Sequence, residues 1–60
     1  MLSKKDIQDL RRIQLEQGGI CNRDLDTKGY EYHKIRFYTL SMVLRIPLEE
    51  YMKEWEQKTR

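Results

Sequence analysis

The 60-residue chain has little of several residue types, and each shortage excludes a class of protein. Cys21 is the only cysteine, so no disulfide can form within the chain, and a reducing compartment is expected. Because structural zinc sites normally need four Cys or His ligands, Cys21 and the single histidine, His33, cannot build one. The longest apolar run, Met42-Val43-Leu44, is too short for a signal peptide or a membrane span. These shortages predict a cytoplasmic protein with no metal, no cofactor and no membrane partner.

Charge of one sign is not in excess either. The formal net charge is +2, and acidic residues nearly balance the basic ones in both halves of the chain. Dedicated nucleic-acid-binding domains usually show a clustered basic patch and an extreme pI, so charge alone does not identify a partner. Hydrophobic residues make up 38% of the chain, which is enough for a small core. A chain of this length forms one domain at most, residues 1–60, whose stability is marginal or depends on a partner.

The first predicted helix covers residues 3–17. Ser3 is a favourable N-cap, and Asp6 follows three residues later, where an acid can bond back to the cap. Gly18 or Gly19 is expected to end this helix. Residues 18–29 are rich in Gly, Asn and Asp and predict an irregular connector, which either contains a short helical turn around residues 22–25 or is a functional loop.

Two further helices are expected, over residues 30–46 and 47–58. The first contains neither Gly nor Pro and repeats apolar residues at helical spacing, whereas Pro47 ends it and suits the first turn of the next. Residues 37–46 are apolar nearly all round, and two short neighbouring helices cannot cover such a helix completely. The sequence therefore predicts a small all-α three-helix domain, with the irregular connector between its first two helices and surplus apolar surface on the second.

Chemistry-bearing residues are few. Cys21 beside Arg23 has some potential for reactivity, although such a residue more often acts as a small apolar filler. His33 suits a pair with Glu31, a pH-sensitive contact or a half-exposed surface position. With only these groups, Ser41 and scattered acids, no arrangement of nucleophile, base or paired carboxylates is indicated. We expect no enzyme, no catalytic residue and no small-molecule substrate.

Protein interaction is the leading hypothesis, because Trp, Tyr and Met are residue types that carry interface hot spots. We expect a small regulator, of the size found in bacteria and their phages, that binds and occludes or modulates a protein partner or pairs with a second copy. An ordinary tight core is the competing interpretation of the same side chains. The predicted apolar anchors are Phe37, Tyr38, Met42, Tyr51 and Trp55, and the predicted orienting charges at the rim are Lys34, Arg36 and Arg45.

The segment YTLSMVLRIPLEEYM, residues 38–52, resembles the closing two helices of phage-repressor-like helix-turn-helix domains. The matching positions are Leu40, Ser41, Leu44, Ile46, Leu48, Glu49, Glu50 and Tyr51. These positions belong to the family's scaffold, so the resemblance implies a helical fold for this half and transfers no base-contacting residue. It also implies an alternative function, a dimeric DNA-binding transcriptional regulator. In that alternative the phosphate contacts are expected from Lys4, Lys5, Arg11, Arg12, Lys34 and Arg36.

Overall fold

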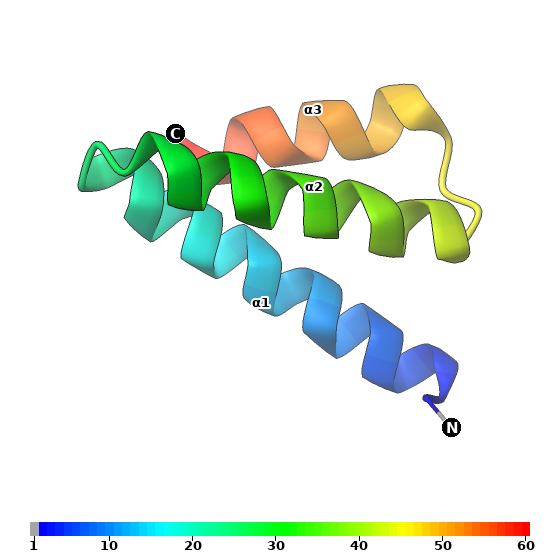
Figure 1. Ribbon diagram of the computed structural model, residues 1–60. Helices are drawn as coiled ribbons and strands as arrows, with labels where there is room; N and C mark the ends of the chain where they lie inside the picture. Colours follow the sequence, from blue (N-terminus) through cyan, green and yellow to red (C-terminus); the bar gives the residue numbers. More distant parts are fainter. Residues whose placement is uncertain (1) are drawn as a thin grey trace.

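The computed structural model describes residues 2–60, which form three helices and no strand: α1 (Lys4–Arg23), α2 (Thr27–Val43) and α3 (Leu48–Thr59). α2 lies between the other two and runs antiparallel to α3, beside it (Figure 1). α1 packs against both, but its N-terminal half diverges from α3 (Figure 1). The predicted all-α three-helix fold is confirmed.

The start of α1 is the one that the sequence predicts. The Ser3 side chain accepts a hydrogen bond from the backbone N–H of Asp6 (3.2 Å), and the Ser3 N–H donates to the Asp6 carboxylate (3.1 Å). This reciprocal capping box satisfies two of the four N–H groups that a helix start leaves without partners.

The predicted irregular connector over residues 18–29 is wrong. α1 continues through both glycines to Arg23, and α2 begins at Thr27, so only residues 24–26 link them. Gly18 does not stop the helix because it serves packing instead: a Cβ at this position would collide with the ring of Trp55. α2 starts three residues before the predicted position because the Asp26 side chain accepts from the Gly29 N–H (3.0 Å) and caps it.

Both α1 and α2 end in a Schellman motif, in which the residue after the C-cap adopts a left-handed conformation. After α1, the N–H of Leu25 donates to Asn22 and that of Asp26 to Cys21, with Leu25 at φ 60°. After α2, the N–H of Arg45 donates to Met42 and that of Ile46 to Ser41, with Arg45 also at φ 60°. α2 therefore ends at Val43 and not at the predicted residue 46. Pro47 then forms the N-cap of α3, one residue before its first helical residue.

The core is a cluster of aromatic rings at the junction of the three helices. Phe37 from α2 and Trp55 from α3 are 0% and 1% exposed, with ring centroids 5.4 Å apart. Tyr51 and Leu15 complete the buried cluster, and Tyr30, Tyr38 and Ile46 pack against it. Tilted aromatic pairs of this kind contribute about 0.5–1.5 kcal/mol each beyond burial of area.

A polar network ties the C-terminal end of α3 to the other helices. The Trp55 indole N–H donates to the Tyr30 hydroxyl (2.9 Å), which lies 3.3 Å from the Thr59 hydroxyl. Thr59 donates to the backbone carbonyl of Trp55 and accepts, at its own carbonyl, from the Asn22 side chain. Across the described residues 2–60, no buried side-chain N or O atom lacks a hydrogen-bond partner.

Candidate functional site

The structure places the predicted apolar anchors in three different environments. Phe37, Tyr51 and Trp55 are core residues, at most 4% exposed, and so they do not form part of the surface in this fold. Tyr38 is half-buried between α2 and α3, where its ring packs against that of Tyr51. Met42 is 57% exposed and is the one predicted anchor that lies well in the open. For the three core residues, the competing interpretation of an ordinary tight core describes their position.

One group of exposed apolar side chains lies on the side of α2 that points away from Phe37 and Ser41. Residues three, four and seven apart share one side of a helix. The large side chains there are 56–62% exposed, although they belong to the most apolar segment of the chain. We call this surface the outer face of α2 and define it by Tyr32, Ile35, Arg36, Thr39, Met42 and Val43.

The site residues Tyr32, Ile35 and Val43 were missed by the sequence-based prediction. The signal for them is present in the sequence, because they occupy the stripe opposite Phe37. It could be recognised only after deciding which stripe is buried. A helix that is apolar nearly all round gives no indication of which side its neighbours cover.

Polar groups on the outer face have partners within the helix itself. The Thr39 hydroxyl donates to the carbonyl of Ile35 (2.9 Å). The Arg36 guanidinium donates to the Tyr32 hydroxyl (3.3 Å) and lies 5.4 Å from the centre of the Tyr32 ring. A buried hydroxyl without a hydrogen-bond partner costs about 1–3 kcal/mol. The Thr39 hydroxyl keeps its bond to Ile35 when a partner covers this face, so it does not add this cost.

A groove of about 230 Å³ runs along one edge of the outer face, between α2 and α1. It is lined by Leu10 from α1 and by Ile35, Arg36, Thr39 and Leu40 from α2. Its lining is mainly apolar, with one positive charge at its rim. The groove is large enough for an inserted side chain and suits an apolar group with an acceptor at its end.

Arg11, predicted as a phosphate contact in the DNA-binding alternative, links all three helices instead. Its guanidinium donates to the Ser41 hydroxyl (2.7 Å), forms an ion pair with Glu54 on α3 and lies 4.3 Å from the centre of the Phe37 ring. The side chain is only 13% exposed. Arg11 is therefore part of the packed interior and does not reach out to a ligand.

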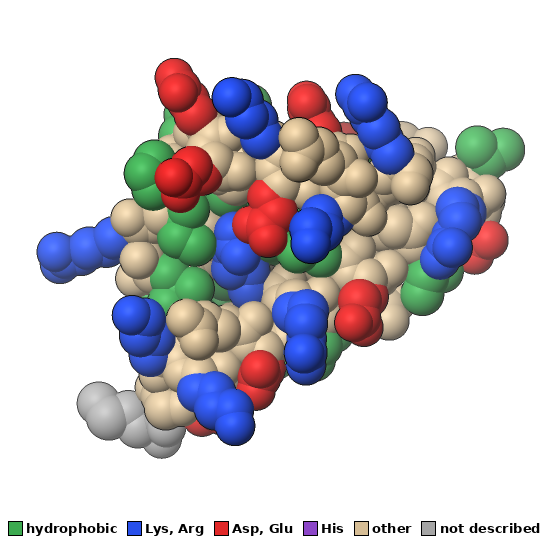
Figure 2. All heavy atoms as spheres, turned by 180° about the vertical axis from the view of Figure 1, so that it is seen from behind, with side chains coloured by type: hydrophobic (Ala, Val, Ile, Leu, Met, Phe, Trp, Pro, Cys, Tyr) green, Lys and Arg blue, Asp and Glu red, His purple; other side chains and the backbone are tan. Residues whose placement is uncertain are grey.

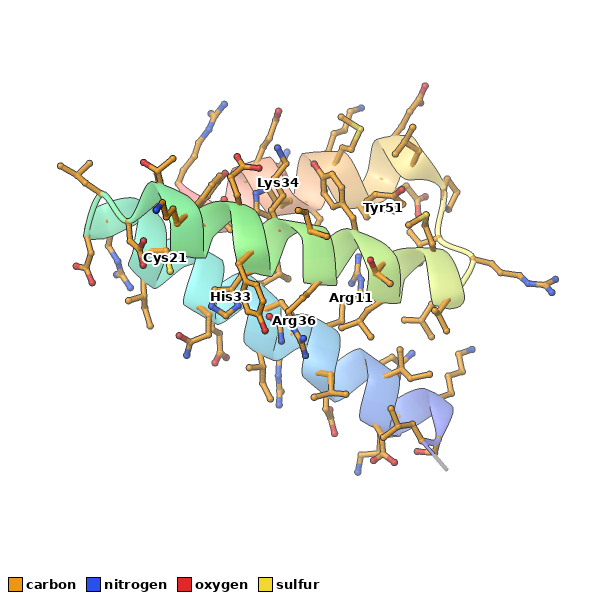
Figure 3. The ribbon with its side chains drawn as sticks, in the orientation of Figure 1. Arg11, Cys21, His33, Lys34, Arg36 and Tyr51 are labelled. Carbon is orange, nitrogen blue, oxygen red and sulfur yellow. The ribbon has the colours of Figure 1, made fainter. Side chains whose placement is uncertain are left out.

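The other basic residues of that alternative are not gathered on one surface. Lys34 and Arg36 lie on opposite edges of α2, as Figure 3 shows, and Lys34 is 4.0 Å from Glu31. The exposed Lys4, Lys5 and Arg12 lie on the N-terminal half of α1. The broad face opposite to that of Figure 1 carries basic and acidic side chains side by side, and its hydrophobic atoms gather toward the edge with the α2–α3 loop (Figure 2). No continuous basic stripe is formed there.

The remaining chemistry-bearing side chains are occupied by packing. Burial raises the pKa of the Cys21 thiol above its ordinary value of 9.0, and the nearby Asp26 carboxylate raises it further. A thiol with a raised pKa is a weaker source of thiolate, the reactive form. His33 does not pair with Glu31, because its Nδ1 donates to the side-chain oxygen of Gln14 on α1 (2.7 Å). Cys21 is thus a buried filler, and His33 joins two helices.

Among residues 2–60, no three His, Cys, Asp or Glu side chains come close enough together to hold a metal ion. In the same part of the chain, each helix is too short or too polar to cross a membrane. Comparison of the chain with protein-family models, with curated proteins and with solved structures finds no match.

Proposed function

We propose that this protein is a small interaction module that binds a protein partner through the outer face of α2. The observation that carries the proposal is the exposure of Tyr32, Ile35, Met42 and Val43, each more than half accessible on a single helix face. Contiguous apolar patches of this kind on a small domain mark interaction sites, whereas scattered apolar residues do not.

A role as a cytoplasmic regulator that occludes or modulates its partner fits the size of the molecule. A standard interface takes about 800 Å² from each partner, which is about a sixth of the 4713 Å² of accessible surface of this chain. Arg36 belongs to the outer face, and Lys34 and Arg45 lie near its members in the chain; these three side chains are the proposed orienting charges.

The DNA-binding alternative has less support from the molecule. α3, the last helix of the segment that resembles the repressor scaffold, carries four glutamates and two lysines. Such a helix would be repelled by phosphates, and Arg11 is already paired with Glu54. Salt dependence separates the two functions, since phosphate binding weakens steeply as salt rises and an apolar interface does not.

Site-specific photo-cross-linking in cells tests the proposal. A photoreactive amino acid in place of Ile35 should cross-link to one defined protein, identified by mass spectrometry. The same amino acid in place of Gln57, which is exposed on α3, is the matched control and should give no such product. Ile35→Asp should abolish capture by a probe placed at Val43. The proposal is wrong if position 35 gives no product, or the same products as position 57.

A further inference from the structure

We infer that one occupant of the outer face is a second copy of this chain, with the two α2 helices antiparallel about a two-fold axis near Ile35 and Arg36. This inference rests on the proposed role of the outer face as a binding surface and names a partner for it. Two-fold pairing requires a surface that is complementary to itself. The distribution of charge along α2, the spacing of its exposed side chains and the groove beside it each meet this requirement.

Charge changes sign along the segment that contains α2. Residues 24–31 carry three acids, Asp24, Asp26 and Glu31, against one base, Lys28. Residues 32–48 carry no Asp or Glu, and their charged side chains are Lys34, Arg36 and Arg45. An antiparallel pair sets the acidic end of one copy against the basic end of the other, whereas a parallel pair sets like charges together. Of the two arrangements, the antiparallel one brings the acidic end of each copy to the basic end of the other.

The exposed stripe of α2 is symmetric about its own centre. Its members, Lys28, Tyr32, Ile35, Thr39 and Val43, follow one another at intervals of three or four residues. Their midpoint lies between residues 35 and 36. Antiparallel pairing about that point sets Tyr32 opposite Thr39 of the second copy, and Asp26 opposite Arg45 of the second copy. Asp24, in the same short link between α1 and α2, lies at the same end of the pair as Asp26.

The groove between α1 and α2 fits this register. It is lined by Ile35, Thr39 and Leu40, which in the antiparallel pair face the segment around Tyr32 of the second copy. A volume of about 230 Å³ accommodates one tyrosine side chain. The Tyr32 ring is 56% exposed in the single chain and would lose that exposure in the groove. Aromatic side chains inserted into pockets are the residues that dominate interface affinity.

The shape of the molecule suits a face-to-face pair. It is a slab of 33 × 24 × 15 Å, and α2 runs along the middle of the broad face shown in Figure 1. A dimer of standard size needs about 800 Å² from each partner, which is about the area of one such broad face. The Thr39 hydroxyl is already bonded to its own helix, so this contact can cover that hydroxyl without leaving it unpaired.

Sedimentation equilibrium of the purified full chain, from about 10 μM to about 1 mM, is the test. The expected result is a monomer–dimer equilibrium with a dissociation constant on the order of 1–100 μM. Ile35→Asp should remain monomeric throughout, and Tyr32→Ala should weaken the dimer roughly tenfold. Gln57→Asp adds the same charge on α3 and should dimerise like the wild type. Far-UV circular dichroism verifies that each variant is folded, which the exposure of these positions favours.

A charge exchange tests the antiparallel arrangement. Asp24→Lys and Arg45→Glu should each weaken the dimer by about threefold to tenfold, because each sets like charges together at both ends. The double variant should regain most of the lost affinity. A double variant weaker than either single one would overturn the antiparallel pairing. A wild-type chain that is monomeric at 1 mM, or dimers unaffected by Ile35→Asp, would overturn the inference as a whole.

The same experiments separate this inference from the proposed function. A monomeric wild type whose position 35 still cross-links to a different protein would contradict only the dimer. A dimer whose position 35 cross-links only to another copy of the chain would support the dimer and contradict the binding of a different protein.

Discussion

The indole of Trp55 rests on the backbone of α1 at Gly18, so closely that a Cβ on Gly18 would come within 2.8 Å of ring atom Cζ2. This contact seats α3 against the C-terminal part of α1. Gly19, the next residue, has no such restriction, since a Cβ there would meet only backbone atoms at 3.7 and 3.9 Å. Two adjacent glycines of one helix therefore have opposite requirements.

Gly18→Ala should lower the free energy of unfolding by about 1–3 kcal/mol, because overpacking forces the Trp55 ring out of its place. Gly19→Ala should raise it by about 0.5–1 kcal/mol, since alanine is the better helix former and fits without strain. Both changes in the free energy of unfolding can be measured by urea titration, with the fluorescence of Trp55 as the signal. Equal effects of the two substitutions would contradict the packing of Trp55 on Gly18.

The bridge from Arg11 to Glu54 should be energetically coupled. Arg11→Met keeps packing on the Phe37 ring but removes the ion pair, and a loss of about 1–2 kcal/mol of stability is expected. A double-mutant cycle with Glu54→Gln should give a coupling of about 0.5–2 kcal/mol. Arg12, which is exposed and 4.0 Å from Asp9, is the control. Arg12→Met should change stability by less than about 0.5 kcal/mol. A cycle without measurable coupling would show that Arg11 acts by packing alone.

The two left-handed positions offer stabilising substitutions. Leu25 has φ 60° and is 87% exposed, so it carries backbone strain and contributes almost no burial. Leu25→Gly should raise stability by about 0.5–1 kcal/mol. Leu25→Ala keeps the strain and is the control, with no gain expected. Thermal unfolding monitored by circular dichroism compares the stability of the two variants. If Leu25→Ala raised stability as much as Leu25→Gly, relief of backbone strain would not be the cause.

Alkaline pH should destabilise the protein through Tyr38. Burial, followed by the charge of Glu56, raises the pKa of this phenol above its ordinary value of 10.0. The Tyr38 phenol therefore keeps its proton to higher pH in the folded chain than in the unfolded chain. This contribution to stability is complete below about pH 10 and is lost as pH rises further. In a Cys21→Ala background, which removes the thiol whose pKa is also raised, Tyr38→Phe should flatten the decline in urea midpoints between pH 9 and 11. If Tyr38→Phe left the slope of urea midpoint against pH unchanged, the contribution of Tyr38 would be contradicted.

Local signals in the sequence are enough for part of the fold. The Ser3–Asp6 capping box is read from nearby residues and lies where it is predicted. Pro47 marks the boundary before the third helix, although it is the N-cap of that helix and not its first residue. The glycines at 18 and 19 could not be read in this way, because Gly18 is required by a side chain 37 positions later in the chain. A tertiary contact overrides the usual meaning of glycine as a helix end.

The candidate site was predictable only in outline. The apolar excess on the second helix correctly indicates exposed apolar surface there, with Met42 among its members. Phe37 and Ile35 are equally apolar in sequence, yet one is 0% and the other 62% exposed. Which of them is buried depends on where α1 and α3 meet α2, and that placement is set by packing between helices, not by periodicity within one.

Along α1, the density of packing changes markedly from one end to the other. Gln14, Leu15, Gly18 and Cys21 are buried in its C-terminal part, whereas no residue before Arg11 in the described chain is more than partly covered. Backbone amides of the first turns should therefore exchange their hydrogens through local fraying. Amides near Gly18 should exchange only when the whole domain unfolds. We therefore expect the one continuous helix to behave as two parts, a protected C-terminal part and an N-terminal part that opens independently.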